Sequence, residues 1–400
     1  MKSAIAFSDE IDDLKKASEE LSSTIKEKLV FEKATLGVVF CDADVDVAEL
    51  GRRLHESLGI DVLGVTTTAS IERNSGYHDM GIVLSVVTSD DVSIVTGKTG
   101  VLTPDNFEQQ IRDAYTQAEA RLGNSPTFIY IGAPYIANIT SDKYMFALDA
   151  LANSIPIFGG VATDHYDLQY QKTFLNGEAG AESMVFALFS GNIKPVFAME
   201  HEFGGKTLSK GVVTRSSGNQ VEKIGDCTFV EYLSEITPVP NEETVIFHFQ
   251  STPFVLEMPD YEQSEQPIVR ALCTINHETG AGGFLSDMPE GSVLSINVLQ
   301  RDNLRGSCCM TLSRLMDQMR ENEDYCYSMV FISTCNARHL LMSETKNMEA
   351  NILAETLSDL DPDLNVAGFY GFGEICPTAV KGSGKAKNRF HNVSFAVCAI

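Results

Sequence analysis

The chain lacks the long apolar runs and the secretion signals of membrane and exported proteins. No apolar stretch reaches the ~18 residues that cross a bilayer. The N-terminal segment, MKSAIAFSDE, turns acidic after a few apolar residues and has no apolar core of a signal peptide. We therefore expect neither membrane insertion nor export.

Positive charge is also scarce. The chain has 30 Lys and Arg residues against 55 Asp and Glu, for a net charge of −25. The basic stretch Lys381–Arg389 is short and interrupted by glycine. A protein that binds nucleic acid or anionic lipid must neutralise phosphates, so we expect neither ligand here.

Cysteine motifs and metal motifs are missing as well. The nine cysteines are scattered, without CxxC and without a Cys/His pair at zinc-finger spacing. Most of them lie in apolar, strand-like surroundings, which is typical of free cysteines in a reducing compartment. No two histidines have helical i, i+3 or i, i+4 spacing. We expect a cytoplasmic protein without a metal site.

The length of 400 residues predicts two domains. Apolar spacing predicts an amphipathic helix over Ser8–Leu29, capped by Ser8, within a leading segment 1–34. Alternating strands and helices predict an α/β domain over 35–240, whose strands become antiparallel from about Tyr170, and a second α/β domain over 241–400. The expected fold is α/β, with mixed sheets, crossover helices and an antiparallel region between the α/β halves.

Several local predictions follow from the same pattern. Residues 80–97 are expected to form a hairpin around Ser89 and Asp90, and Thr244–Phe249 a strand. The strand, loop, helix and glycine-ended strand of 127–164 have a counterpart in 328–375. This correspondence indicates either an internal duplication or the general likeness of βαβ units. Parallel sheets bind ligands beyond the carboxyl ends of their strands, so each half is expected to place a site there.

Common catalytic motifs are absent. The stretch KGSGKA lacks the leading glycine and the hydroxyl residue of a phosphate-binding loop, because Ala379 and Ala386 occupy those positions. There is no G-x-S-x-G motif. Cys335 follows a strand with Arg338 and His339 close by, so it is either a reactive thiol or a small buried core residue.

Two isolated charges mark the ends of strands in the C-terminal half. Arg338 follows one strand, and Glu374 lies in the glycine-rich stretch GFYGFGEICP that ends another. If these strands are neighbours, the two side chains either hold a zwitterion such as an amino acid or pair with each other. Glycines would let a ligand approach the backbone closely.

These motifs give the chain a family resemblance. It resembles the FIST family, a FIST N domain followed by a FIST C domain, over roughly Thr35 to the end. The segments that carry the resemblance are LGVTTTASI, IPIFGGVATDH, FLNGEAGAESMVFALFSG, FISTCNAR, VAGFYGFGEICP and HNVSFAV. The residues after Gly64 depart from the family pattern, because they lack its Cys, second Gly and Glu.

The resemblance implies a sensory module that binds a small ligand. The candidate ligand-binding residues are Arg338, Glu374, Tyr370, Gly373, Cys335 and Asn336. No output domain follows, so we expect signalling through a partner protein in trans, and the leading helix either docks that partner or packs on its own sheet.

Two alternatives stay open beside a sensor without catalytic activity. The first is haem-based sensing of nitric oxide, which some family members perform. A single imidazole is enough to ligate a haem. The candidates are His201, His248, His277, His339 and His391. The second alternative is an enzyme that uses Cys335 as its nucleophile.

Overall fold

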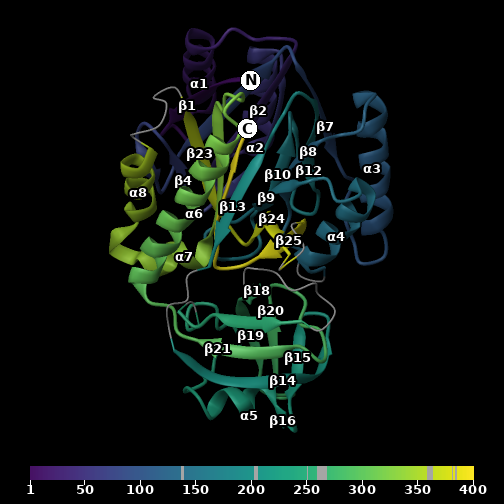
Figure 1. Cartoon of the computed structure of the whole chain (residues 1–400), viewed down its shortest axis with the longest axis vertical. Coiled ribbons are helices and arrows are strands. Elements are labelled where there is room, and N and C mark those ends of the chain that lie inside the picture. The colour runs from purple at the N-terminus through teal and green to yellow at the C-terminus, as the bar shows by residue number, and fades with distance from the viewer. Residues whose placement is uncertain are drawn as a thin grey trace.

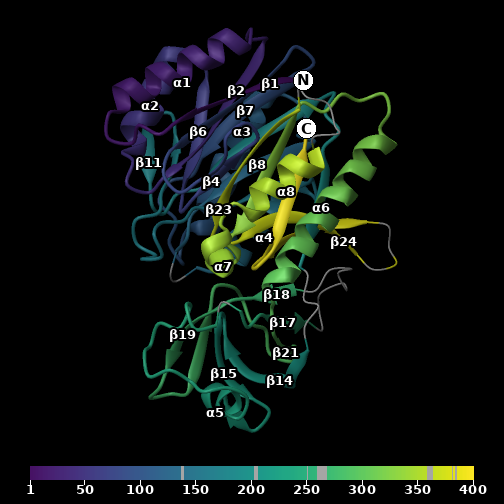
Figure 2. The same ribbon diagram turned by 90° about the vertical axis from the view of Figure 1, so that its left-hand side faces the viewer.

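The computed structural model describes residues 1–136, 139–201, 206–249, 251–258, 268–357, 364–380, 382 and 385–400. It shows a large upper body of sheets and helices above a smaller unit of antiparallel strands, and both termini lie in the body (Figures 1 and 2). None of the described helices combines the length and apolar content of a membrane span. Lys381, Ser383 and Gly384 of the basic stretch lie outside the described residues.

The body contains three six-stranded sheets that share one topology. The first sheet uses a unit with β1 Lys2–Ser8, α1 Leu14–Lys28, β2 Ala34–Asp42, α2 Val47–Leu58, β3 Asp61–Thr67 and β6 Ile82–Ser89. Asp46 caps α2 by accepting from the backbone of Ala48 and Glu49, and Gly59 ends it in the left-handed conformation. Strands β2 and β3 are parallel, as the spacing predicts.

The second and third units repeat this order. The second has β7 Val92–Lys98, α3 Phe107–Leu122, β8 Phe128–Ala133, α4 Ser141–Ala152, β9 Ile157–Val161 and β12 Val185–Gly191. The third has β13 Val196–Glu200, α6 Arg301–Glu321, β22 Met329–Cys335, α7 Asn336–Met342, the short turn η1 Ser343–Thr345, α8 Met348–Leu357, β23 Asn365–Gly371 and β26 Phe395–Ala399. Again β8 is parallel to β9, and β22 to β23.

Each unit gives a hairpin to the sheet of another unit. The hairpins are β4 Ser70–Glu72 with β5 Gly76–His78, β10 Thr173–Leu175 with β11 Glu178–Gly180, and β24 Glu374–Ala379 with β25 Ala386–His391. They extend the third, first and second sheets, respectively. The registers agree: Ile71 faces Gly368, Phe174 faces Gly64 and Ile375 faces Gly159. The correspondence between 127–164 and 328–375 is therefore part of a threefold structural repeat.

The three sheets enclose one apolar core, and the helices cover their outer faces. Side chains from all three sheets meet in the centre, among them Phe40, Tyr130, Phe158, Phe331 and Phe369. Helices α1 and α2 pack on the first sheet, α3 and α4 on the second, and α6 and α8 on the third. This arrangement brings the carboxyl ends of β3, β9 and β23 together.

The lower unit is inserted into the third repeat, between β13 and α6. It is an eight-stranded antiparallel sheet around its own apolar core. Its elements are β14 Thr207–Ser217, β15 Gln220–Ile224, β16 Cys227–Thr228, α5 Phe229–Ser234, β17 Phe254–Glu257, β18 Ile268–Arg270, β19 Leu272–Asn276, β20 Ala281–Phe284 and β21 Val293–Asn297. The boundary placed at 240–241 from the sequence falls inside this unit.

Three local predictions are wrong. Strands β6 and β7 do not form a hairpin, because β6 pairs with β1 and β2, and β7 pairs with β12 in another sheet. Residues 244–249 form turns and a single bridge rather than a strand. Helix α1 begins at Leu14 and is capped by Asp13, because Ser8 already belongs to β1.

The leading helix packs on its own sheet. Ala17, Leu21 and Ile25 are completely buried in the same apolar cluster as Ala4 and Ile82. The periodicity that predicts the helix therefore reflects packing within the body.

Candidate functional site

The candidate site lies where the third parallel pair ends. Strand β22 ends at Cys335, opposite Gly371 of β23, and α7 begins at once with Asn336. A cavity with a free volume of about 30 Å³ lies between these strand ends and the lower unit. Cys335, Asn336 and Gly371 line it from the body, and Ala271 and Leu272 line it from the lower unit.

Asn336 is the notable polar group of this wall. It is 3% exposed, and its Oδ1 has no hydrogen-bond partner among the described residues. Its amide lies 2.9 Å from Thr68 Oγ1. Thr68 donates to the carbonyl of Asp164 at 2.7 Å, so its oxygen accepts from Asn336 and the nearer Asn336 group is the NH₂. Oδ1 is therefore the open acceptor.

Cys335 lines the cavity, and Glu374 lies beside its thiol. Both are buried, and burial raises the pKa of each well above its ordinary value. Ser394 donates its hydroxyl to Glu374 Oε2 at 2.5 Å and its backbone N–H at 3.2 Å. Oε1 has no nitrogen or oxygen donor among the described residues, and the neighbouring Cys335 thiol lowers the pKa of Glu374 against the larger opposite effect of burial. The thiol of Cys335 stays protonated at neutral pH, which makes it a poor nucleophile.

Arg338 faces the other way. Its Nε donates to Glu349 of α8 at 2.8 Å, and its Nη1 donates to Ser307 of α6 at 2.9 Å. Nη2 donates to the carbonyl of Leu304 and contacts Cys308. Arg338 and Glu349 are both buried. The pairing of Arg338 with Glu374, one of the two alternatives that the sequence left open, is not formed, because α7 turns the guanidinium toward the helices behind the sheet.

Tyr370 and Gly373 also support the body rather than the cavity wall. Tyr370 is fully buried beside Glu349, and burial followed by that charge raises its pKa well above the ordinary value. Gly373 accepts from the backbone N–H of Val161 at 3.0 Å. It has a φ of +154°, and an added Cβ would lie 2.1 Å from Phe390 Cζ. The glycine of this turn therefore serves close packing between strands.

Three elements meet at His339 beside the cavity. Tyr166 lines the cavity and lies 2.7 Å from His339 Nδ1, and Tyr77 lies 2.5 Å from Nε2. Tyr77 also donates to Asp79, so Nε2 carries the proton and Nδ1 accepts from Tyr166. Burial, followed by the charge of Lys346, lowers the pKa of His339 to about 4. The imidazole is neutral at pH 7.

The lower unit is fixed to the body by an ion pair. Arg270, at the end of β18, donates to Asp142 of α4 at 2.9 Å, and both side chains are buried. Arg270 also donates to the carbonyls of Val269, Asp287 and Phe390. This pair crosses the interface beside the cavity.

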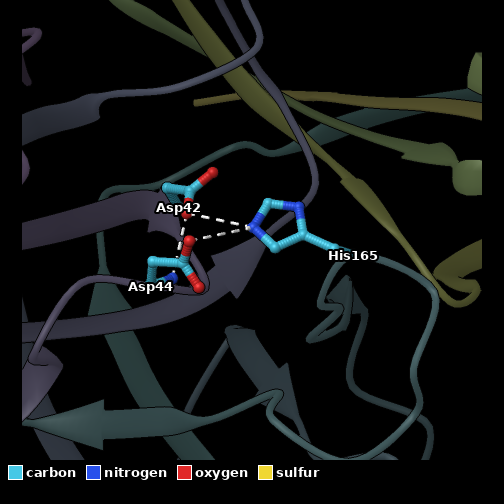
Figure 3. A group of neighbouring side chains, drawn as sticks. All are labelled: Asp42, Asp44 and His165. Carbon is cyan, nitrogen blue, oxygen red and sulfur yellow. Dashed lines mark hydrogen bonds and ion pairs between the residues drawn. The ribbon is translucent and has the colours of Figure 1, made fainter.

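A further polar group lies at the end of β2. Asp42 Oδ1 is 3.2 Å from His165 Nε2, and Asp44 Oδ2 is 3.8 Å from the same nitrogen (Figure 3). Asp42 is buried, whereas Asp44 and His165 are exposed. Two carboxylates and an imidazole are donors that divalent cations accept. This group has no local signal in the sequence, since His165 follows β9 in another unit.

The structure divides the six predicted site residues into two groups. Cys335 and Asn336 line the cavity, and Glu374 lies directly behind Cys335. Arg338, Tyr370 and Gly373 belong to packed contacts of the body.

The histidines considered for haem are placed differently. His201 and His391 lie against each other in the interior, with Nε2 and Nδ1 3.4 Å apart. None of the described residues that line the cavity is a histidine. Haem binding stays a prediction.

Comparisons with known proteins identify the family. No curated protein matches the chain. Among solved structures, cyanuric acid hydrolase from A. caulinodans is similar at a TM-score of 0.35 and 8% identity, over 99% of this chain and 98% of that one. This score is too low to carry an argument. Residues 35–226 match the FIST N domain, and residues 229–377 match the FIST C domain. The chain belongs to the FIST family, as a FIST N domain followed by a FIST C domain.

Proposed function

We propose that this chain is a sensor without catalytic activity that binds a small molecule in the cavity between body and lower unit. FIST domains are generally sensory domains that bind small ligands. The observation that carries the proposal is Asn336 Oδ1, a buried acceptor without a described partner on the wall of a cavity at the strand ends. Other described buried polar atoms also lack a partner, but among the described lining residues of this cavity only Asn336 carries such an atom, and leaving it unsatisfied is costly, so it points to a ligand.

The proposed ligand contacts both parts of the molecule. Asn336 and Gly371 belong to the body, whereas Ala271 and Leu285 belong to the lower unit. A bound ligand would favour one arrangement of the two parts over another, because it gains contacts only where both walls reach it. We propose that a partner protein, bound in trans, reads this arrangement.

The chemistry of Cys335 supports binding rather than catalysis. Its pKa is raised by burial and by the charge of Glu374, which opposes formation of the thiolate. An amino acid held between Arg338 and Glu374, as the sequence suggested, would need a free guanidinium. Arg338 instead forms a buried ion pair with Glu349. The proposed site is therefore the cavity that Cys335 lines.

A thermal-shift screen of small metabolites tests the proposal. A ligand that binds only the folded state raises the melting temperature by mass action. Ala271→Leu fills the cavity, and Ala147→Leu on α4 is a matched control outside it. We expect stabilising compounds to lose their effect in Ala271→Leu and to keep it in Ala147→Leu. Compounds that stabilise all three proteins equally would show that the ligand binds elsewhere.

A further inference from the structure

The chemistry of the cavity wall points to the class of ligand. We propose that the ligand is a small, uncharged and mostly apolar molecule with one N–H or O–H group, which donates to Asn336 Oδ1. This inference rests on the proposed function, since it assumes that the cavity is the binding site. It excludes the zwitterionic amino acids that the sequence suggested.

The walls are apolar apart from a few groups. Most of the described lining residues are apolar, among them Phe249, Pro253, Leu272, Leu285 and Leu340. Such walls favour apolar ligand surface, at roughly 25 cal/mol for each Å² removed from water. Polar ligand groups therefore need a specific partner in the cavity.

Asn336 is a lining residue, and its buried amide oxygen has no hydrogen-bond partner among the described residues. One N–H of the Asn336 NH₂ group donates to Thr68, and Oδ1, as an amide oxygen, can only accept. An N–H or O–H donor satisfies it, whereas a carboxylate oxygen facing it would be repelled. The thiol of Cys335 is neutral and adds no charge to the wall.

No unpaired charge faces the cavity among its described lining residues. Arg270 is the charged residue of that lining, and Asp142 with three carbonyl oxygens already occupies its guanidinium. A ligand carboxylate would have to compete with Asp142, and a ligand ammonium would meet no carboxylate. Burying an unpaired charge is far more costly than burying a hydrogen-bonded neutral group, so a neutral ligand is favoured.

The size of the cavity limits the ligand. A free volume of about 30 Å³ has room for about two waters. A ligand of several non-hydrogen atoms must therefore displace water and push the wall outward.

Matched probe pairs test the ligand class. Indole and phenol are neutral and carry one donor, whereas 1-methylindole and anisole have the same shape without it. We expect each donor probe to bind three- to tenfold more tightly than its methylated partner in titration calorimetry. In Asn336→Leu this preference should disappear. The comparison in the wild-type protein needs no variant, so it stands even if Asn336→Leu fails to fold.

The outcomes separate this inference from the proposed function. If L-leucine or L-phenylalanine binds instead, and binding is lost in Ala271→Leu, the cavity is the site but the neutral class is wrong. Equal affinity for donor and methylated probes would overturn the role of Asn336. If no probe or metabolite is sensitive to Ala271→Leu, the proposed function itself fails.

Discussion

Asn336 and Arg338 are two residues apart at the start of α7, yet their environments are opposite. Both are buried polar side chains. Arg338 has hydrogen-bond partners on α6 and α8, whereas Asn336 leaves an acceptor open on a cavity wall. A buried group with partners stabilises the fold, whereas a buried acceptor without one, on a residue that lines a cavity, is a candidate for ligand binding. This difference assigns Arg338 to the packing of the body and Asn336 to the proposed binding site.

The largest effect is expected on the structural side. Arg338→Ala leaves Glu349 buried without its cation, so we expect a loss of about 3–5 kcal/mol in the free energy of unfolding. Urea denaturation followed by circular dichroism measures this loss. The double variant Arg338→Met with Glu349→Leu should regain most of it. A stable Arg338→Ala protein with weakened ligand binding would instead place Arg338 in the site.

His339 sharpens the comparison through pH. Its pKa of about 4 in the folded state lies below the ordinary 6.5, so the unfolded chain takes up the proton first as the pH falls. The stabilisation from neutral His339 is complete above about pH 6.5 and decreases toward pH 4, by at most about 3 kcal/mol. His339→Gln should lose less stability than wild type over this range. If the unfolding free energies of wild type and His339→Gln changed with pH in parallel, the lowered pKa of His339 would be contradicted.

Gly373 tests whether the glycine-rich turn serves packing. Gly373→Ala places a methyl group against the Phe390 ring, so we expect a cost of about 2–3 kcal/mol. Gly123→Ala is the matched control, since Gly123 has a φ of +74° but no atom within 4 Å of its added Cβ. The control should cost only about 1 kcal/mol. Equal losses of stability for Gly373→Ala and Gly123→Ala in thermal denaturation would show that the contact with Phe390 does not destabilise the Gly373→Ala protein.

The smallest effect is expected on the binding side. Asn336→Leu removes one hydrogen bond to Thr68, but it also removes an unpaired buried oxygen. These terms oppose each other, so the free energy of unfolding should change by less than about 1 kcal/mol. Urea denaturation of Asn336→Leu and Arg338→Ala under the same conditions compares the two losses in the free energy of unfolding. A loss as large as that of Arg338→Ala would show that Asn336 is structural too.

The sequence predicts the parallel strand pairs well because their apolar runs and helix caps are local signals. The βαβ pattern of 127–164 and 328–375 corresponds to β8–β9 and β22–β23. The exchange of hairpins between units leaves no local trace, since β4 pairs with β23 almost 300 positions away. The predicted hairpin of β6 and β7 is wrong for the same reason: proximity in sequence does not decide which sheet a strand joins.

The candidate site was predictable only in part. A strand end followed by polar residues indicates Cys335 and Asn336, because ligands bind beyond the carboxyl ends of parallel strands. The partner of Arg338 was not predictable, since Glu349 lies in a helix whose one other acidic residue, Glu355, is exposed, and the sequence does not show which of the two is buried. Arg270 and Asp142 are 128 positions apart, and only the docking of the lower unit brings them together.

The affinity of the strongest hit from the metabolite screen tests the central claim most directly. Titration calorimetry should compare the wild-type protein, Ala271→Leu and the control Ala147→Leu. We predict at least tenfold weaker binding in Ala271→Leu and unchanged binding in the control. An unchanged dissociation constant in Ala271→Leu would contradict a ligand site in this cavity.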